Sequence, residues 1–300
     1  MKKITIDGNG ICSRMAYLFT EVSGIYPITP SSTMAENVDK MASNKEKNIF
    51  GDIAKVVEMQ SEAGAAGLIH GALESGTLAT TFTASQGLLL MIPNMYKMSG
   101  EMLPAVFHVA ARSLSTHALS IMGDHQDIYA VRSTGFAIIS SSNVQDIAYL
   151  TPISHLSAIS SSIPVLHFFD GFRTSHEISK IDMLETNELL DLVPYDKMQN
   201  FRNRSLNPKH PNVRGTNQND DIYFQITESR NKDYEYLINI VEDYMNKINE
   251  KAHTNYKPFN YYGSKTAKKV IVAMGSVNDT IKEVIDNLND DLGLIEVHLY

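Results

Sequence analysis

The sequence contains one cysteine, no tryptophan and no apolar run of membrane-spanning length. The single thiol, Cys12, excludes an internal disulfide, a cysteine-ligated iron–sulfur cluster and a Cys-ligated zinc site within these residues. The longest apolar run, residues 88–92, stops at Pro93 and is far shorter than the about 20 residues that span a bilayer. The N-terminus also lacks the apolar core of a signal peptide. We therefore expect a cytoplasmic protein in a reducing compartment, with no membrane partner.

Clustered positive charge is missing as well. The 34 Asp and Glu residues outnumber the 26 Lys and Arg residues, and the formal net charge is −8. Because nucleic-acid phosphates are bound by clustered Lys and Arg, this balance argues against a nucleic-acid partner. The hydrophobic content of 43% is that of an ordinary soluble globule, and 300 residues suffice for one large domain and part of a second.

Several signatures of catalysis and metal binding are also absent. The chain has no glycine-rich phosphate loop with a Walker lysine, no nucleophile elbow and no His-Glu-x-x-His motif. Its ten histidines show no metal-ligand spacing. The acids and the imidazole of residues 123–127 are better explained by helix capping and loop hydrogen bonds than by a metal. The sequence therefore predicts no metal site in this chain.

Apolar segments of strand type and of helix type alternate along the first part of the chain. Strands that alternate with helices imply an α/β fold with a doubly wound, mainly parallel sheet, helices on both faces, and ligands at the carboxyl ends of the strands. The predicted strands are 55–59, 78–83, 105–111, 136–139 and 165–169, and the predicted helices are 61–74, 86–99 and 144–160.

The pattern changes after Glu177. An irregular arm is expected at about 200–225, and residues from Tyr234 to Ile248 include one apolar helix face. A polar, Tyr-rich linker is expected at 253–268. It is followed by a strand at 269–276, a helix to about Leu288 and a strand at 294–298. Because one such βαβ unit cannot cover its own sheet, we expect it to open a second, larger α/β domain.

Residues 24–34 connect an apolar run to a new helix. Pro27 and Pro30 fix their own φ angles and favour extended conformations in the residues before them, Tyr26 and Thr29. Residues 33–36 read as a capping box that starts the helix. The hydroxyls of this segment, Thr29 among them, would then cluster near free backbone N–H groups and suit a bound anion or polar cofactor. The alternative is a stiff loop whose hydroxyls only cap the helix.

Two charged residues follow predicted strands directly. Glu62 lies at the start of the predicted helix 61–74, which is rich in small residues. It could exchange a hydrogen bond with a ligand ring nitrogen, or it could simply complement the helix dipole. Arg112 ends the strand 105–111, where its planar fork suits a carboxylate, although a surface ion pair is an equal alternative. Asp170 and Arg173, after the strand 165–169, are expected to pair with each other.

Several motifs in the same order resemble one family, the pyruvate:ferredoxin (flavodoxin) oxidoreductases. The likeness is to the N-terminal region of these enzymes and covers nearly the whole chain. The segments that carry it are 26–32 (Tyr-Pro-Ile-Thr-Pro-Ser-Ser), 60–67 (Gln-Ser-Glu-Ala-Gly-Ala-Ala-Gly), 110–112, 117–127, 167–177 (His-Phe-Phe-Asp-Gly-Phe-Arg-Thr-Ser-His-Glu), 206–211, 214–216 and 221–225.

The resemblance implies a thiamine diphosphate enzyme that decarboxylates pyruvate, forms acetyl-CoA from coenzyme A, and passes electrons through 4Fe-4S clusters to ferredoxin or flavodoxin. It implies that Glu62 hydrogen-bonds the cofactor's aminopyrimidine ring, that Thr29 and Arg112 hold the pyruvate carboxylate, and that Pro27, Ile28 and Thr29 line the cofactor. Residues 1–255 would form the pyrimidine-side thiamine diphosphate domain, and residues 256–300 the linker and truncated start of a transketolase C-terminal-like domain.

The chain also departs from the family pattern. It has no Gly-Asp-Gly…Asn signature for Mg²⁺ and diphosphate and no cysteine motifs for iron–sulfur clusters. The sites for Mg²⁺ and for the clusters are therefore expected in other domains of a longer polypeptide. That polypeptide is expected to form a homodimer. Thr33 stands where proline is more usual. The isolated 300 residues are expected to be inactive. Two alternatives stay open: an oxidoreductase for another 2-oxo acid, and a non-catalytic assembly domain fused to another reductase.

Overall fold

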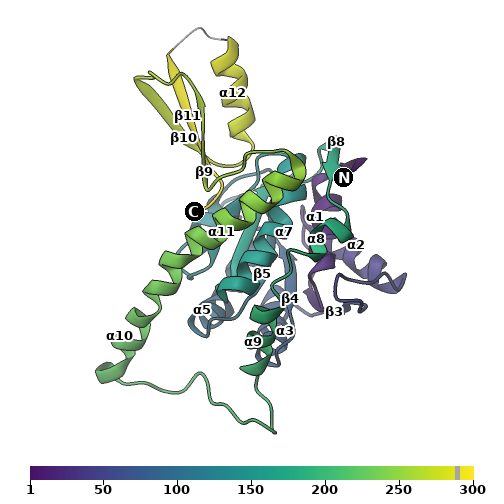
Figure 1. Cartoon of the computed structure of the whole chain (residues 1–300), viewed down its shortest axis with the longest axis vertical. Helices are drawn as coiled ribbons and strands as arrows, with labels where there is room; N and C mark the ends of the chain where they lie inside the picture. Colours follow the sequence, from purple (N-terminus) through teal and green to yellow (C-terminus); the bar gives the residue numbers. More distant parts are fainter. Residues whose placement is uncertain (288–290) are drawn as a thin grey trace.

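The computed structural model describes residues 1–287 and 291–300. Its centre is a six-stranded sheet with the order β3-β2-β4-β5-β7-β6, in which every neighbouring pair is parallel (Figure 1). The strands are β2 (Val22–Ile25), β3 (Lys55–Glu58), β4 (Ala79–Thr83), β5 (Val106–Ala111), β6 (Ala137–Ser140) and β7 (Val165–Asp170). All residues of β4 to β7 are buried, as expected for a parallel sheet covered on both faces. The predicted fold class is confirmed.

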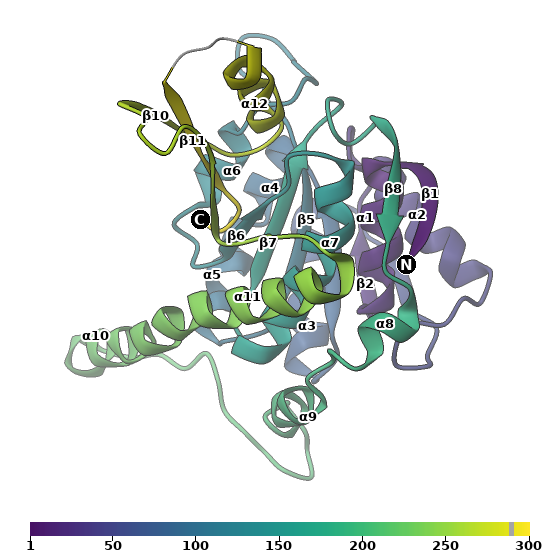
Figure 2. The ribbon, with the colours of Figure 1, turned by 45° about the horizontal axis from the view of Figure 1, so that its top comes forward.

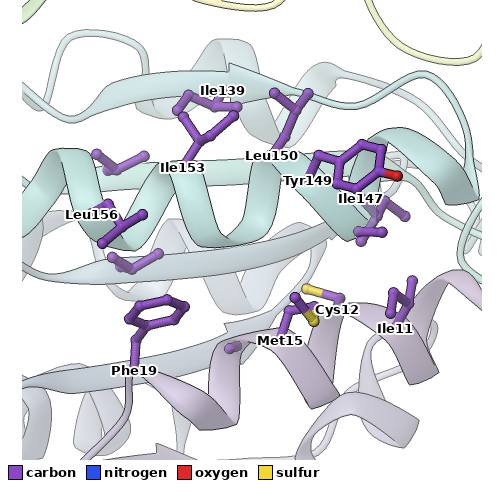
Figure 3. Packing of buried hydrophobic residues seen from close by; sticks show 14 of the residues in the cluster. Ile11, Cys12, Met15, Phe19, Ile139, Ile147, Tyr149, Leu150, Ile153 and Leu156 are labelled. Carbon is purple, nitrogen blue, oxygen red and sulfur yellow. The ribbon is translucent and has the colours of Figure 1, made fainter. Parts of the chain in front are cut away.

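Helices cover both faces of this sheet, and each face has its own hydrophobic cluster. Five helices contribute to the first cluster, and Figure 3 shows α1 residues Cys12 and Met15, with Phe19 just after α1, on the side of α7 that carries Ile147 and Leu156. The helices of the first face are α1 (Gly8–Leu18), α2 (Ser32–Ser43), α7 (Val144–Ser161), α8 (Thr186–Leu190) and α11 (Asn231–Ala252). Those of the second are α3 (Glu62–Glu74), α4 (Ser85–Leu90), α5 (Ile92–Gly100), α6 (Gln126–Val131) and α9 (Tyr195–Asn203).

Two local predictions in this domain are corrected, and one pair of strands was not predicted. The single helix expected at 86–99 is split into α4 and α5 at Met91, because Pro93 lacks the N–H that a continuous helix would need. The capping box expected at 33–36 is wrong: α2 already begins at Ser32, its N-cap Ser31 makes no side-chain cap bond, and the Ser31 hydroxyl donates to the carbonyl of Ile28 instead (2.7 Å). An antiparallel pair that was not predicted, β1 (Lys2–Asp7) with β8 (Ile178–Met183), lies beside α7.

The C-terminal part forms a second, smaller sheet with the order β10-β11-β9. The predicted βαβ unit is confirmed, since β10 (Lys269–Ala273) and β11 (Leu292–Val297) are parallel and α12 (Val277–Asn287) connects them. The predicted helix end near Leu288 lies outside the described residues. The linker prediction is wrong in part, because β9 (Phe259–Gly263) forms within it and pairs antiparallel with β11; its aromatic residues favour strands. The domain boundary between 255 and 256 stays a prediction.

Two connections complete the chain. After β8 and α8 (Thr186–Leu190), the irregular arm spans 204–219, shorter than predicted, because α9 extends to Asn203 and α10 (Asp220–Ser229) starts early. Figure 2 shows α10 projecting away from the body, while α11 returns across the face that α7 covers. Of the helices described, none has both the length and the apolar composition needed to cross a membrane.

Candidate active site

The three predicted site residues follow strands at the carboxyl edge of the large sheet. Thr29 follows β2, Glu62 is the first residue of α3 after β3, and Arg112 follows β5 directly. In the sheet order, β4 lies between β2 and β5. Any side chain that packs over the end of β4 is therefore flanked by the loops that carry Thr29 and Arg112.

Thr29 and Arg112 are in direct contact, although 83 positions separate them. The Arg112 guanidinium donates from Nη1 to the backbone carbonyl of Thr29 (2.6 Å). The loop itself is held from two sides: Asn9 donates from Nδ2 to the carbonyl of Pro30 (2.8 Å), and a Cβ added to Gly171 would lie only 2.6 Å from Pro30 Cγ. The loop of Thr29 is thus fixed against the ends of β5 and β7.

The Arg112 side chain is buried, with 6% of its surface exposed. Burial lowers the pKa of Arg112, and the nearby carboxylate of Asp127 opposes this shift. Its Nε atom is buried without a hydrogen-bond partner among the described residues. A buried, unpaired guanidinium N–H is costly, so this donor favours a polar ligand such as a carboxylate.

Glu62 packs over the end of β4. It is 6% exposed, and the Ser61 hydroxyl caps its helix by accepting from the N–H of Gly64 (3.1 Å). A Cβ added to Gly87 would lie 2.7 Å from Glu62 Oε1 and 2.8 Å from Thr83 Oγ1, so the glycine lets α4 approach the acid closely. No hydrogen bond to the Glu62 carboxylate occurs within residues 1–287 and 291–300, and Thr83 Oγ1 is likewise buried and unpaired there. These groups are available to a polar ligand.

The remaining residues of the 24–34 segment have mixed outcomes. Pro27 and Ile28 are half-buried on the loop before Thr29, whose own residue surface is exposed. The segment carries four hydroxyls close together, those of Thr29, Ser31, Ser32 and Thr33. That of Ser31 is used within the loop, and Ser32 and Thr33 lie inside α2. The expected cluster of free hydroxyls at a helix start is therefore reduced, and Thr29 is its member at the sheet edge.

Asp127 is a buried residue for which the sequence predicted helix capping or loop hydrogen bonds, without naming the partners. Its carboxylate accepts from the backbone N–H groups of Ser85 (2.8 Å), Arg112 (3.0 Å) and Ile128 (2.8 Å). Burial raises the pKa of Asp127 to about 6, against the effect of these N–H donors. The expected loop hydrogen bonds of 123–127 are confirmed, and Asp124 adds another by accepting from Gln126 N (2.9 Å). The partners in other segments could not be read from local spacing.

The expected pair of Asp170 with Arg173 is wrong. Asp170 instead contacts His125 (Oδ1 to Nε2, 2.6 Å) and accepts from the N–H of Ser276 (2.7 Å), while Arg173 lies 3.9 Å from Glu177. Burial alone would lower the pKa of His125, but the hydrogen bond and charge of Asp170 raise it overall. Burial would likewise raise the pKa of Asp170, but His125 lowers it. The hydrogen bond from Ser276 to Asp170 joins the large sheet to the C-terminal unit.

A buried histidine cluster lies in the core beneath the edge. The Nδ1 atoms of His108 and His167 are 3.1 Å apart, His108 Nε2 is 3.1 Å from His155 Nε2, and His167 Nε2 is 2.8 Å from the Ser141 hydroxyl. Cys12 lies within 4.8 Å of His108 and His167. Burial lowers the pKa of His155 and of His167 to about 3, so the rings are neutral and pair with one another. Chain spacing did not predict this grouping, because tertiary packing creates it.

Comparison with known proteins now adds to this geometry. Residues 14–246 match the family described as pyruvate flavodoxin/ferredoxin oxidoreductase, thiamine diphosphate-binding. The chain belongs to this family. Similar proteins include a pyruvate-flavodoxin oxidoreductase from Klebsiella pneumoniae, 54% identical over 100% of this chain and 26% of the relative, and a pyruvate:ferredoxin oxidoreductase from Moorella thermoacetica, 53% identical with the same coverage. A pyruvate dehydrogenase [NADP(+)] from Euglena gracilis is 52% identical over 99% of this chain and 17% of its own length.

The chain therefore spans about a quarter or less of the length of these relatives. Among solved structures, 2-oxoglutarate:ferredoxin oxidoreductase from Magnetococcus marinus superposes with a TM-score of 0.74 over 99% of this chain and 54% of that chain, at 17% identity. This match shows that the two chains share a fold over nearly the full length of this one. Thiamine diphosphate is the cofactor of the domain, and the unpaired carboxylate of Glu62 and hydroxyl of Thr83 fit a ligand with polar ring atoms.

Proposed function

We propose that this chain supplies the pyrimidine side of the thiamine diphosphate site, and the carboxylate-binding residues, of an enzyme that oxidatively decarboxylates pyruvate to acetyl-CoA and CO₂. One observation carries the proposal: Arg112 contacts the Thr29 loop and Glu62 packs over the intervening strand end, all at one sheet edge. The high identity to enzymes named for pyruvate supports the choice of substrate.

Each residue has a distinct role in this proposal. Glu62 exchanges a hydrogen bond with a ring nitrogen of the cofactor's aminopyrimidine, and its burial keeps water from competing for that bond. Pro27 and Ile28 line the cofactor. Arg112 uses Nη1 to hold the Thr29 loop, which leaves the fork of Nε and Nη2 for the pyruvate carboxylate. The Thr29 hydroxyl adds a further donor to that carboxylate.

Thiamine diphosphate, when bound, supplies the electron sink for loss of CO₂ from the 2-oxo acid. The chain's contribution is to orient and desolvate the reacting groups, which avoids reorganisation during the reaction. Its own residues provide one hydrogen-bonding acid and one guanidinium in a site where both are buried.

The rest of the activity belongs to regions beyond these 300 residues in the proposal. We infer that Mg²⁺, the 4Fe-4S clusters and the sites for coenzyme A and for ferredoxin or flavodoxin lie in the remaining polypeptide of a cytoplasmic homodimer. Residues 1–255 form the thiamine diphosphate domain and residues 256–300 open the next one. The small share of each relative that this chain covers supports the presence of these further regions.

The test uses the full-length polypeptide that carries this chain, loaded with thiamine diphosphate and Mg²⁺. Reduction of a viologen dye with coenzyme A is measured on a panel of 2-oxo acids. We expect turnover with pyruvate and a loss of several orders of magnitude in Glu62→Gln. Preference for 2-oxoglutarate would establish the alternative substrate, and a protein that binds the cofactor but turns over no 2-oxo acid would indicate an assembly domain.

A further inference from the structure

Asp127 joins the two halves of the candidate active site. Its side chain is 0% exposed, and a single oxygen, Oδ2, accepts from both Ser85 N (2.8 Å) and Arg112 N (3.0 Å). Ser85 follows β4, and Arg112 follows β5. One buried carboxylate oxygen therefore fixes the ends of two adjacent parallel strands.

The Ser85 side of this junction leads to Glu62. Ser85 has a φ of +51°, in the left-handed region that serine rarely adopts, and it begins α4. Two residues later, Gly87 approaches Glu62 so closely that a Cβ would lie 2.7 Å from Oε1. Because the N–H of Ser85 is held by Asp127, the position of Gly87 against Glu62 depends on that bond.

On the other loop, Asp127 holds Arg112, whose guanidinium is the proposed carboxylate-binding group. The backbone of Arg112 is fixed by Asp127 and its side chain by the carbonyl of Thr29. The negative charge of Asp127 also faces the partly desolvated guanidinium. The Asp127 carboxylate therefore fixes the backbone from which the Arg112 side chain extends, and its negative charge offsets that of the guanidinium.

We propose that Asp127 is a positioning residue that sets Arg112 and, through Ser85 and Gly87, Glu62. The inference rests on the proposed function of that site. Asp127 does not touch substrate or cofactor in this role; it acts through backbone N–H groups of the two loops.

Other bonds between the loops allow the role of Asp127 to be tested by mutation. The Ser85 hydroxyl donates to the Ser113 carbonyl (2.7 Å), Gln86 Nε2 donates to the Ser115 carbonyl (3.0 Å), and Leu114 N donates to Gln126 Oε1 (2.9 Å). These contacts hold the loops near each other without Asp127, so its loss is expected to shift the site rather than unfold the domain.

The test compares Asp127→Asn with wild type and with Asp124→Asn in the full-length protein. Asparagine carries no charge and has one acceptor oxygen, so at least one of the three N–H groups loses its bond, and every bond that remains is a weaker, neutral one. We expect KM for pyruvate to rise about 10-fold and kcat to fall about 10-fold, as for a lost charge-assisted bond. Calorimetry should show several-fold weaker thiamine diphosphate binding to the apoprotein. Asp124→Asn, in the same loop, should leave these constants within twofold of wild type.

The outcomes separate this inference from the function on which it rests. If wild type turns over no 2-oxo acid, the proposed function fails. If wild type is active and Asp127→Asn is folded with wild-type KM, kcat and cofactor affinity, the positioning role is refuted. A lower unfolding temperature with unchanged constants would show a merely structural role and also refute it. Should Asp127→Asn not fold, Asp127→Ser, which keeps one acceptor, is measured in the same way; failure of both to fold would overturn the local role.

Discussion

Replacing Gly87 by alanine should displace Glu62 without adding charge or removing a hydrogen bond. The new Cβ would lie 2.7 Å from both Cγ and Oε1 of Glu62, whereas ordinary contacts begin at 3.4 Å, so the acid must move by roughly 0.7 Å. Overpacking of this kind costs about 1–3 kcal/mol, offset by the about 1 kcal/mol that alanine gains over glycine within a helix. Since a misplacement of about 1 Å costs up to about 100-fold in rate, we expect kcat to fall roughly 10- to 100-fold.

The assay is pyruvate-dependent viologen reduction by the full-length Gly87→Ala protein, with thermal unfolding measured in parallel. Gly71→Ala is the matched control, because Gly71 lies within α3 and a Cβ there meets nothing within 4 Å. The control should keep wild-type kcat and gain about 0.8–1 kcal/mol of stability. A folded Gly87→Ala protein with wild-type kcat would show that the reaction does not depend on this position of Glu62.

Three further predictions concern other parts of the site and core. Arg112→Lys should raise the pyruvate KM about 10- to 100-fold with a smaller effect on kcat, because a point charge replaces a fork; an unchanged KM in steady-state kinetics would reject Arg112 as the carboxylate anchor. The His125–Asp170 pair should stabilise the 300-residue chain at mildly acid pH. The pKa of His125 is raised in the folded state, so His125 stabilises the fold fully below its ordinary pKa of 6.5, and this stabilisation is lost as pH rises through the folded pKa. The pKa of Asp170 is lowered in the folded state, so Asp170 stabilises the fold above 3.8, and this stabilisation is lost as pH falls through its folded pKa. The free energy of unfolding in urea should therefore decline from pH 6 to pH 8 more steeply in wild type than in His125→Gln, and identical slopes would contradict the pair's role. Cys12 is fully buried and burial raises its pKa, so a thiol reagent should label it only after denaturation; rapid labelling of the native protein would contradict its place in the core.

The elements of the large sheet could be predicted because their signals are local. Runs such as 105–111 are apolar throughout, which is typical of strands buried on both faces, and their alternation with helices indicates parallel pairing. The pair β1 and β8 was missed because neither strand is apolar: every residue of β1 is exposed or half-buried, and only Ile181 and Met183 of β8 are buried. The β9 strand was hidden for the same reason in a polar segment.

The site could be predicted in part. Parallel strands place their carboxyl ends together, so the nearness of Thr29 and Arg112 follows from the order of strands and loops. Local spacing misled for Asp170, because its partner His125 is 45 positions away in the chain. The link from Asp127 to Ser85 spans 42 positions and also needs the folded sheet. No periodic pattern in the sequence indicates either pairing.

The central claim is that Glu62 acts on the bound thiamine diphosphate. Exchange of the cofactor's C2 proton with deuterium, followed by NMR on the full-length holoprotein without pyruvate, tests it most directly. We predict that Glu62→Gln slows this exchange by at least about 100-fold, while Glu36→Gln, an exposed acid on α2, exchanges as wild type does. Wild-type exchange in a Glu62→Gln protein that still binds the cofactor would contradict the account.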